Sequence, residues 1–403
     1  MNSNSSMAES RRNPRFILCA LVVSASYALL TYLIDAHIAA NAHSDLYSHA
    51  SLVPDVLLSD GLAFFWRRVP YFGFHLLMAA GMSVGLSMST AAAVACALFN
   101  GLAAFVAFYV VSRFLGRWGK AKISLIAIIT LVCLFVTAAY LPWFNGDIYI
   151  GQGSPTVWHN PTYLAVKPVV LLAVYWFFGC LEEGAPTKEF ALFAFAMLIS
   201  LLLKPSFFQV MLPAALLFAA IEGLMGKKYL PWGKMALAFA PAVIYAGLQA
   251  ATLFFLPPVE GSNNGGGVGL VLFSGWSSYS PNAGVSILLL LAFPLFGLIA
   301  CWKNAGEKKR DLLFLGVMLA VGLLEILLLA EKGARAGHGN FDWGLYCAVF
   351  ASWVYLLPLF VRQSFKDKVL SKPLVSVGLI LVAWHFASGL LYAWRMLSTS
   401  ALY

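Results

Sequence analysis

The sequence predicts an all-α protein, a polytopic bundle of transmembrane helices, and three observations carry this prediction. Of the 403 residues, 61% are hydrophobic and only 11% are charged, whereas soluble domains carry about a quarter charged residues. Apolar runs of about 20 residues, the length that a helix needs to cross a bilayer, recur along nearly the whole chain. The lysines and arginines gather in short clusters between these runs, as they do when the cytoplasmic leaflet retains them. A nucleic-acid partner is therefore not expected, despite the net charge of +9.

The apolar runs predict about eleven spanning helices within a single transmembrane domain, residues 1–403. They lie near 16–34, 90–112, 123–142, 165–181, 190–203, 206–224, 235–255, 285–302, 312–330, 345–361 and 373–393. The first run follows Arg11, Arg12 and Arg15 and is too long for the core of a signal peptide. We expect it to be an uncleaved helix whose N-terminus lies in the cytoplasm.

The apolar segment 71–88 could be counted as a twelfth span, but the distribution of charge argues against it. If it crossed, the basic loop 113–122 and every later basic loop would lie outside the cytoplasm. If it only dips into the outer leaflet, most of the 26 Lys and Arg residues lie inside, as the positive-inside rule requires. We therefore predict a re-entrant or interfacial segment at 71–88, preceded by an interfacial helix from Leu52 to Trp66.

The six cysteines all lie within or at the ends of apolar runs, and none is spaced from another as metal ligands are. Disulfides and a zinc site are therefore not expected, and no other cofactor is firmly implied.

On this topology the chemically varied loops lie on the outer face. They span 35–70, 143–164, 256–284 and 331–344. Six of the seven histidines fall on that side, namely His37, His43, His49, His75, His159 and His338. The sequence therefore predicts a site that faces outward.

The first outer loop offers a candidate catalytic pair, Asp45 and His49. The two residues are four positions apart and share one face if the segment is helical. A carboxylate beside an imidazole can accept a proton from a hydroxyl nucleophile. The alternative is that both are solvated residues that only help to fold the loop.

The second outer loop carries side chains suited to a sugar, which presents an apolar ring face and hydroxyl groups. The candidates for sugar or acceptor binding are Asp147, Gln152, Trp158, His159 and Asn160, together with His75 from segment 71–88. The alternative is an aromatic belt with a capped helix start at Asn160-Pro161.

The last outer loop offers a candidate phosphate clamp. Lys332, Arg335 and His338 lie in a glycine-bearing loop, and arginine meets phosphate in a bidentate fork. Lys204, between two spans at the outer leaflet, is a fourth candidate. The alternative is an ion pair between Glu331 and Arg335. The glycine run Gly265–Gly269 lacks the context of a phosphate-binding loop and predicts a mobile lid or an ordinary flexible loop.

Two motifs resemble those of the GT-C superfamily of membrane glycosyltransferases. The first is Asp45-Leu-Tyr-Ser-His49, and the second is Val69-Pro-Tyr-Phe-Gly-Phe-His-Leu-Leu77. Residues 90–116, which end in a basic Arg-Phe-Leu-Gly turn, are similar to the second span of that family. The resemblance covers a catalytic module at 16–165 and is architectural only over 166–403.

The resemblance implies an inverting transfer of a sugar from a polyprenyl-phosphate donor to a cell-envelope glycan or lipid acceptor. It implies Asp45 as the base, with Asp35 as a rival, and Arg335 or Lys332 as the holder of the lipid phosphate. The 143–164 loop has only Asp147 and no Asp-x-Asp pair, which argues against dependence on a divalent metal. The expected location is the bacterial inner membrane, with the active site outside the cytoplasm.

Two other functions remain open from the sequence. One is a polysaccharide polymerase or ligase that uses lipid-diphosphate donors. The other is not an enzyme but a transporter or lipid flippase, which would predict internal repeats and interrupted helices at the membrane midplane.

Overall fold

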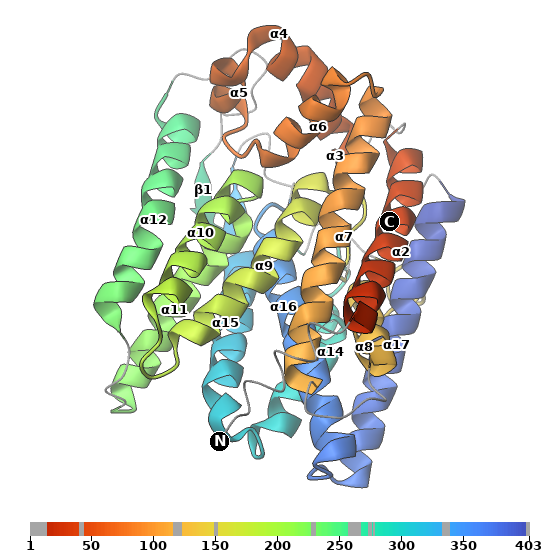
Figure 1. Cartoon of the computed structure of the whole chain (residues 1–403), viewed down its shortest axis with the longest axis vertical. Coiled ribbons are helices and arrows are strands. Elements are labelled where there is room, and N and C mark those ends of the chain that lie inside the picture. Colours follow the sequence, from red (N-terminus) through yellow and green to blue (C-terminus); the bar gives the residue numbers. More distant parts are fainter. Residues whose placement is uncertain are drawn as a thin grey trace.

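The computed structural model describes residues 14–39, 44–115, 123–148, 152–226, 231–256, 267–272, 276, 279–332 and 339–399. The long helices lie side by side, and several short helices cover one end of the bundle (Figure 1). The long helices are α2 (Pro14–Ile38), α7 (Met88–Leu115), α8 (Ile123–Phe135), α9 (Pro161–Cys180), α10 (Thr187–Leu203), α11 (Ser206–Leu224), α12 (Trp232–Phe254), α14 (Ala283–Trp302), α15 (Lys309–Leu328), α16 (Asp342–Val361) and α17 (Lys372–Ser398).

Short helices from one stretch of the chain form what we call the cap. They are α3 (Asp45–Leu52), a π-helical turn (Val53–Leu57), α4 (Leu58–Asp60), α5 (Leu62–Arg68) and α6 (Gly73–Ser83). We call the end that they cover the cap end. Helix α6 has eleven residues, about 17 Å at 1.5 Å per residue, against the roughly 30 Å of bilayer hydrocarbon. This length agrees with the prediction that 71–88 does not cross.

The interfacial helix expected from Leu52 to Trp66 is interrupted in the structure. Gly61 has a φ of +84°, in the left-handed region that favours glycine, and it separates α4 from α5. The cap therefore bends over the bundle rather than lying as one straight rod.

Nine helices within the described residues are long and apolar enough to cross a membrane, so the chain is a helical bundle of the membrane type. Two of the eleven expected spans fall short of that length. The run at 123–142 forms only the thirteen residues of α8, and the run at 190–203 lies in α10, which has seventeen.

Helix α8 ends early because the following backbone bonds to other helices. Thr137 donates its N–H to the carbonyl of His385 (3.4 Å) and accepts a hydrogen bond from His385 Nδ1 (2.5 Å). A Cβ added to Gly389 would overlap the carbonyl of Phe135, so α17 passes against this irregular segment. Non-helical backbone is tolerated at membrane depth where protein satisfies it. The prediction of a continuous helix over 123–142 was wrong after Phe135.

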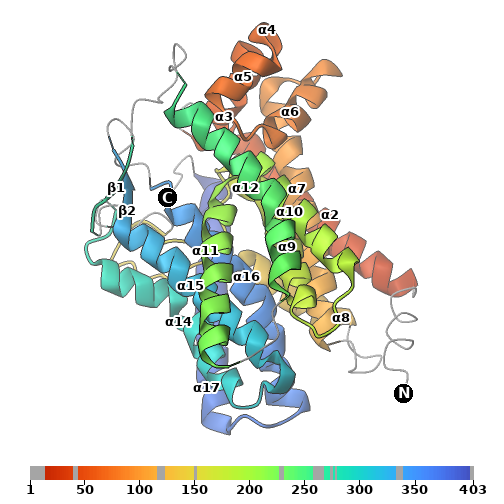
Figure 2. The ribbon, with the colours of Figure 1, turned by 90° about the vertical axis from the view of Figure 1, so that its left-hand side faces the viewer.

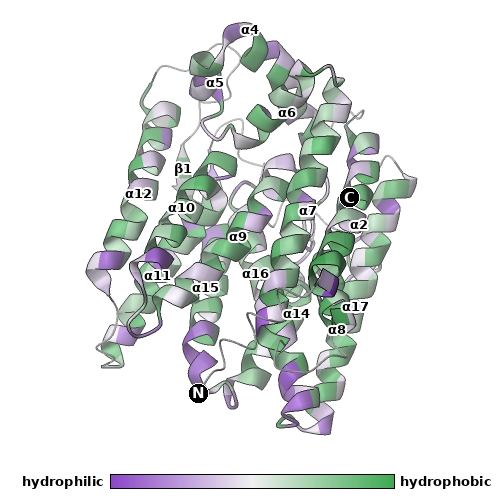
Figure 3. Ribbon diagram, viewed as in Figure 1, coloured by the Kyte–Doolittle hydropathy of each residue, from purple (hydrophilic) through white to green (hydrophobic). Residues whose placement is uncertain are grey.

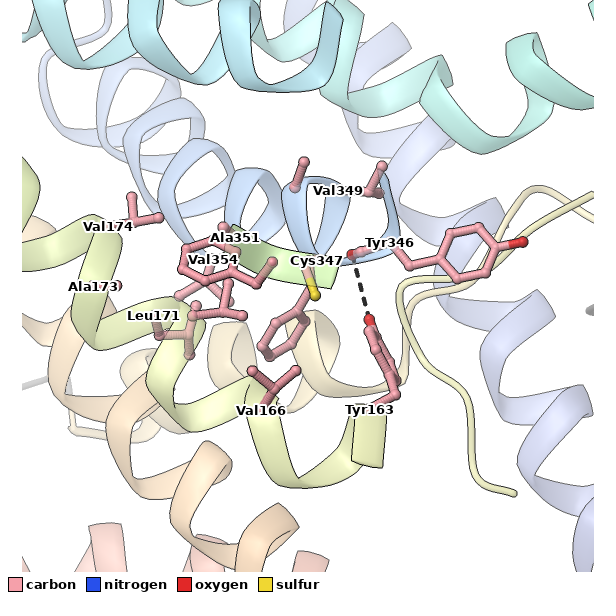
Figure 4. Packing of buried hydrophobic residues seen from close by; sticks show 14 of the residues in the cluster. Tyr163, Val166, Leu171, Ala173, Val174, Tyr346, Cys347, Val349, Ala351 and Val354 are labelled. Atoms are coloured by element: carbon pink, nitrogen blue, oxygen red, sulfur yellow. Dashed lines mark hydrogen bonds between the residues drawn. The ribbon is translucent and has the colours of Figure 1, made fainter. Parts of the chain in front are cut away.

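Helix α16 is the centre of the bundle, because every one of its twenty residues is buried. Figure 4 shows its contact with α9, where Val166, Leu171 and Val174 face Cys347 and Val354. At the cap end of this contact, Tyr163 donates its hydroxyl hydrogen to the carbonyl of Tyr346 (3.3 Å). The first turn of α9, which carries much of the candidate site, is thereby fixed to the core.

Two strands interrupt the otherwise helical fold. Strand β1 (Val268–Leu270) pairs antiparallel with β2 (Leu329–Glu331), and Gly269 lies opposite Ala330. The ribbon lies at one side of the bundle, next to α15 (Figure 2). The all-α fold class is confirmed apart from this short ribbon, while the expectation of a loop or lid was wrong for the end of the glycine run. The rest of that run lies outside the described residues.

Hydrophilic residues gather at the two ends of the bundle and leave its middle hydrophobic (Figure 3). We call the end opposite the cap the basic end. Arg113 lies over the ring of Tyr175 there, and Lys234 lies over the ring of Phe190. Other basic residues of this end are Lys188, Lys303, Lys309, Arg310, Arg362 and Lys372. Their placement follows the charge pattern of the sequence, while the orientation in a membrane stays a prediction.

Candidate active site

Asp45 is an accessible carboxylate at the first turn of α3. Ser44 caps this helix, since its hydroxyl oxygen accepts the N–H of Tyr47 (3.0 Å). A carboxylate in the first turn is favoured by the positive N-terminal end of the helix dipole. The residue is exposed, while its rival Asp35 is fully buried within α2. Of the two predicted bases, only Asp45 can meet a substrate as the chain is folded.

Asn160 links Asp45 to the start of α9. Its Nδ2 donates to Asp45 Oδ2 (2.9 Å), and its Oδ1 accepts from the backbone N–H of Tyr163 (2.9 Å) and the hydroxyl of Thr162 (3.0 Å). These donors fix which end of the amide faces the carboxylate. The predicted capped helix start at Asn160 is confirmed, and the same side chain also holds Asp45.

Lys204 brings a positive charge to the same amide. Its Nζ donates to Thr162 Oγ1 (3.0 Å) and to Asn160 Oδ1 (3.3 Å). It lies 4.5 Å from the centre of the Trp343 ring, at the start of α16. The residue is only 7% exposed, so the turn between α10 and α11 directs its ammonium group inward.

Three histidines complete the cluster. His49 lies one turn after Asp45 in α3, as the spacing predicted, and its Nδ1 is 3.2 Å from Nε2 of the buried His75. Burial lowers the pKa of His49 to about 4, although the Asp45 carboxylate opposes the shift. Burial also lowers the pKa of His75 and of His159. All three imidazoles are therefore neutral at pH 7.

The pKa of Asp45 is lowered by its neighbours. Desolvation alone would raise it, but the hydrogen bond from Asn160 and the charges of His159, His49 and Lys204 at the low pH at which Asp45 titrates outweigh that effect. The carboxyl is therefore ionised at neutral pH. An accessible carboxylate with a fixed ammonium nearby can accept a proton while the ammonium stabilises an anion.

A cavity of about 410 Å³ adjoins this cluster. Lys204 lines it, and so does Tyr71, whose ring packs edge-on against that of His49. Arg68 and Lys332 add two further basic groups. The apolar walls come from α11 and α12, through Phe208, Leu212, Pro213, Ala246, Ala250 and Leu253. Glu331 also lines the cavity, so basic groups outnumber acidic ones three to one among its charged side chains. A lining that is basic and largely apolar suits an anionic amphiphile.

The structure brings together six of the twelve residues that the sequence singled out for the site. They are Asp45, His49, His75, His159, Asn160 and Lys204. Lys332 lines the same cavity as Lys204 and is in this way connected to the cluster. Arg335 and His338 lie outside the described residues.

Three predicted sugar-binding residues lie elsewhere. Trp158 is fully buried and packs against the rings of Tyr27 and Phe135, so it presents no free face. Gln152 is fully buried as well. Asp147 lies in a turn in which its N–H donates to the side chain of Asn145 (3.0 Å). Their predicted role gains no support from these positions.

Sequence reasoning missed Arg68 and Trp343. Arg68 is the last residue of the cap helix α5, and its expected position on the outer face was the only signal that it could reach the cavity. Trp343 follows an acidic residue at the start of an apolar run, and nothing in that local pattern indicated its contact with Lys204.

No protein-family model matches the chain, and its comparison with curated proteins finds no match. Among the described residues, no group of three or more His, Cys, Asp or Glu side chains is placed to hold a metal ion.

Proposed function

We propose that the chain is an inverting glycosyltransferase of the GT-C type. It moves a sugar from a polyprenyl-phosphate donor to a glycan or lipid acceptor of the cell envelope, on the extracytoplasmic face of the inner membrane. One observation carries the proposal. Asn160 joins an accessible carboxylate, Asp45, to a buried ammonium, Lys204, and Lys204 lines the cavity together with two further basic groups and many apolar side chains.

The cavity fits the two parts of such a donor. Lys204, Lys332 and Arg68 line it and would meet the phosphate, and arginine can do so with two parallel hydrogen bonds. The apolar side chains of α11 and α12 would lie along the first isoprene units. Arg335 and His338 stay predicted partners of the same phosphate.

The reaction that this arrangement favours is a single displacement at the anomeric carbon. The acceptor hydroxyl oxygen forms a bond to that carbon, and its proton passes to the Asp45 carboxylate. The bond from the anomeric carbon to the phosphate oxygen breaks, and its electron pair stays with the phosphate. Lys204 stabilises the negative charge that grows there, and a preorganised charge of this kind is often the largest single contribution to the rate.

The proposed topology has eleven crossings and a cytoplasmic N-terminus. Helix α8 together with the segment that follows Phe135 would make one crossing, and α10 another. The gathering of basic residues at the end opposite the cap supports this orientation, because cytoplasmic loops carry the excess of Lys and Arg.

A transporter or lipid flippase is the second candidate, and a specific observation favours it. Helix α8 stops inside the bundle, and Lys167 of α9 is fully buried 4.6 Å from the ring of Phe350. Interrupted helices and intramembrane charges are both typical of transporters. A polymerase or ligase that uses lipid-diphosphate donors would need the same basic groups in the cavity. It would differ from the proposed enzyme only in its donor.

The test is the incorporation of radiolabelled sugar by the purified protein from polyprenyl-phosphate and polyprenyl-diphosphate donors. Wild type should turn over a monophosphate donor, and Asp45→Asn should lower the rate about a hundredfold or more because the base is lost. Asp55→Asn is the matched control, since Asp55 is an exposed carboxylate of the same cap. If no donor is turned over while a labelled lipid or solute crosses proteoliposomes, the transporter takes the place of the enzyme.

A further inference from the structure

Lys332, one of the three basic groups of the cavity, is attached to the β ribbon in an unusual way. Its backbone N–H donates to the carbonyl of Gly267 (2.7 Å) just beyond the paired residues. Its side chain then runs across Gly269. A Cβ added to Gly269 would overlap Cε of Lys332, and it would lie 3.0 Å from Nζ and 3.3 Å from Cδ.

The backbone conformation of Gly269 does not itself require glycine. Its φ lies outside the left-handed region, and a glycine inside a strand weakens the pairing. Glycine in such a position often marks a close approach by another group, and here that group is the stem of Lys332. The exposed neighbours Val268 and Leu270 lie on either side of it in the strand.

This close approach has a consequence for the ammonium group. A free lysine side chain loses rotamer entropy when it is ordered. Contact along Gly269 confines the stem before any ligand arrives, and preorganisation of this kind raises affinity. Lys332, Arg68 and Lys204 come from three distant segments, yet they line the same cavity.

We infer that strand β1 positions the side chain of Lys332. Gly269 gives the Lys332 stem a channel that aims its ammonium group into the cavity, and so sets the affinity for an anionic headgroup. The identity of that anion as the phosphate of an isoprenoid lipid rests on the proposed function. Gly269 is a positioning residue, because it acts only through Lys332.

The experiment measures binding to the full-length protein in detergent. The probes are a synthetic polyprenyl phosphate and the polyprenol of the same chain length, and the readout is the ratio of their dissociation constants. Gly269→Ala should lower the preference for the phosphate about tenfold, because the displaced ammonium group loses its hydrogen bond to the charged phosphate. Lys332→Met should lower it by a similar factor. Leu270→Ala, in the same strand with its side chain 82% exposed, should leave the ratio unchanged.

The double variant separates positioning from a general effect on the fold. Once Lys332 is replaced by methionine, adding Gly269→Ala should cause no further loss of preference, because contacting residues are not additive. The inference would be wrong if Gly269→Ala kept the wild-type ratio of dissociation constants. It would also be wrong if the losses of the two single variants added in the double variant. If Gly269→Ala unfolds, Lys332→Ala in the same chain should restore its melting temperature by removing the overlap. Failure of that rescue would also count against the inference. A wild type that does not prefer the phosphate over the alcohol would instead contradict the donor site of the proposed function.

Discussion

The two ends of the bundle use the same kinds of residue in different ways. At the basic end, Arg310 donates to both oxygens of Glu222 (2.8 and 2.5 Å) and to the carbonyl of Leu181 (2.5 Å). These contacts tie α9, α11 and α15 together. Lys308 also pairs with Asp311 (2.9 Å) and Arg362 with Asp367 (3.1 Å). Cations and carboxylates neutralise each other there, and the result is a closed structural joint.

At the cap end, neutral groups contact the charged ones. Asn160 donates to Asp45, while Thr162, Asn160 and the indole of Trp343 contact Lys204. Amide, hydroxyl and ring hold these charged groups in place at the candidate site. A charge that is held in this way still exerts its field on a ligand. The kind of partner that holds a charged side chain therefore distinguishes the candidate site at the cap end from the structural ion pair at the basic end.

The largest effect is expected at the basic end, on stability. Glu222→Gln leaves Arg310 without its carboxylate in a largely buried position, and breaking such a pair costs about 3 kcal/mol. Unfolding of the purified protein in detergent measures this loss. Transfer per folded molecule should remain at the wild-type level.

Asp367→Asn provides the matched control, because it breaks the Arg362 pair in which both side chains are about a third or more exposed. Its cost should be about 0–1 kcal/mol. Equal losses in the two variants would contradict the structural joint at Arg310.

The next effect is expected at the cap end, on catalysis. Lys204→Met keeps the apolar stem but removes the ammonium group, and loss of one preorganised donor costs about a hundredfold in rate. The melting temperature should change little in comparison with Glu222→Gln. Initial rates with a polyprenyl-phosphate sugar measure the effect. A variant that keeps its rate but melts early would assign Lys204 to the fold instead of the site.

The sequence predicted the membrane bundle well, since hydropathy depends only on local composition. It also predicted that Asp45, His49, His75, His159, Asn160 and Lys204 belong to one site, because charge placement put them all on one face. It did not predict the end of α8 at Phe135. That end depends on hydrogen bonds from Thr137 to His385, about 250 positions away, and no local pattern reveals them.

The failures at Trp158 and at the glycine run have a related cause. An indole in a polar loop can face a sugar or fill a core, and the choice depends on Tyr27 in another helix. The strand at Val268–Leu270 exists because Leu329–Glu331 pairs with it, while glycine-rich sequence by itself favours a loop. Tertiary partners decide both cases.

A smaller effect is expected from Asn160→Ala, which tests the amide between the two charges. The variant removes a helix cap, worth about 1 kcal/mol of stability. It also removes the N–H that stabilises the Asp45 carboxylate, so the pKa of Asp45 should rise. We expect a rate about tenfold lower and an acidic limb of the pH–rate profile that moves to higher pH.

The control for this variant is Asn282→Ala. Asn282 caps α14 in the same way, since its Oδ1 accepts the N–H of Val285 (3.1 Å). The two variants should lose similar stability, and only Asn160→Ala should change the rate. If the transfer rate dropped equally in Asn160→Ala and Asn282→Ala, Asn160 would act only as a helix cap.

The smallest effect is expected from pH, and it should be confined to the cap end. His49, His75 and His159 have pKa values below the ordinary value, to about 4 for His49, because burial disfavours the charged ring. The unfolded chain therefore binds protons first as the pH falls from about 6.5. Stability from these groups is complete above that pH and is lost as the pH falls towards 4.

Asp45 should not contribute to this loss, since a lowered carboxyl pKa affects stability only below its unfolded value of about 3.9. Hydrogen exchange at pH 5 and pH 7, corrected for the intrinsic rates, measures the change by segment. Protection should fall in α3 and α6, while the amides around Arg310 keep theirs. His75→Gln should flatten the response of α3 and α6, because it removes a buried ring that the unfolded chain would protonate. Equal loss of protection at both ends would mean that the titrating groups do not belong to the cap, and the contrast between site and joint would lose its electrostatic basis.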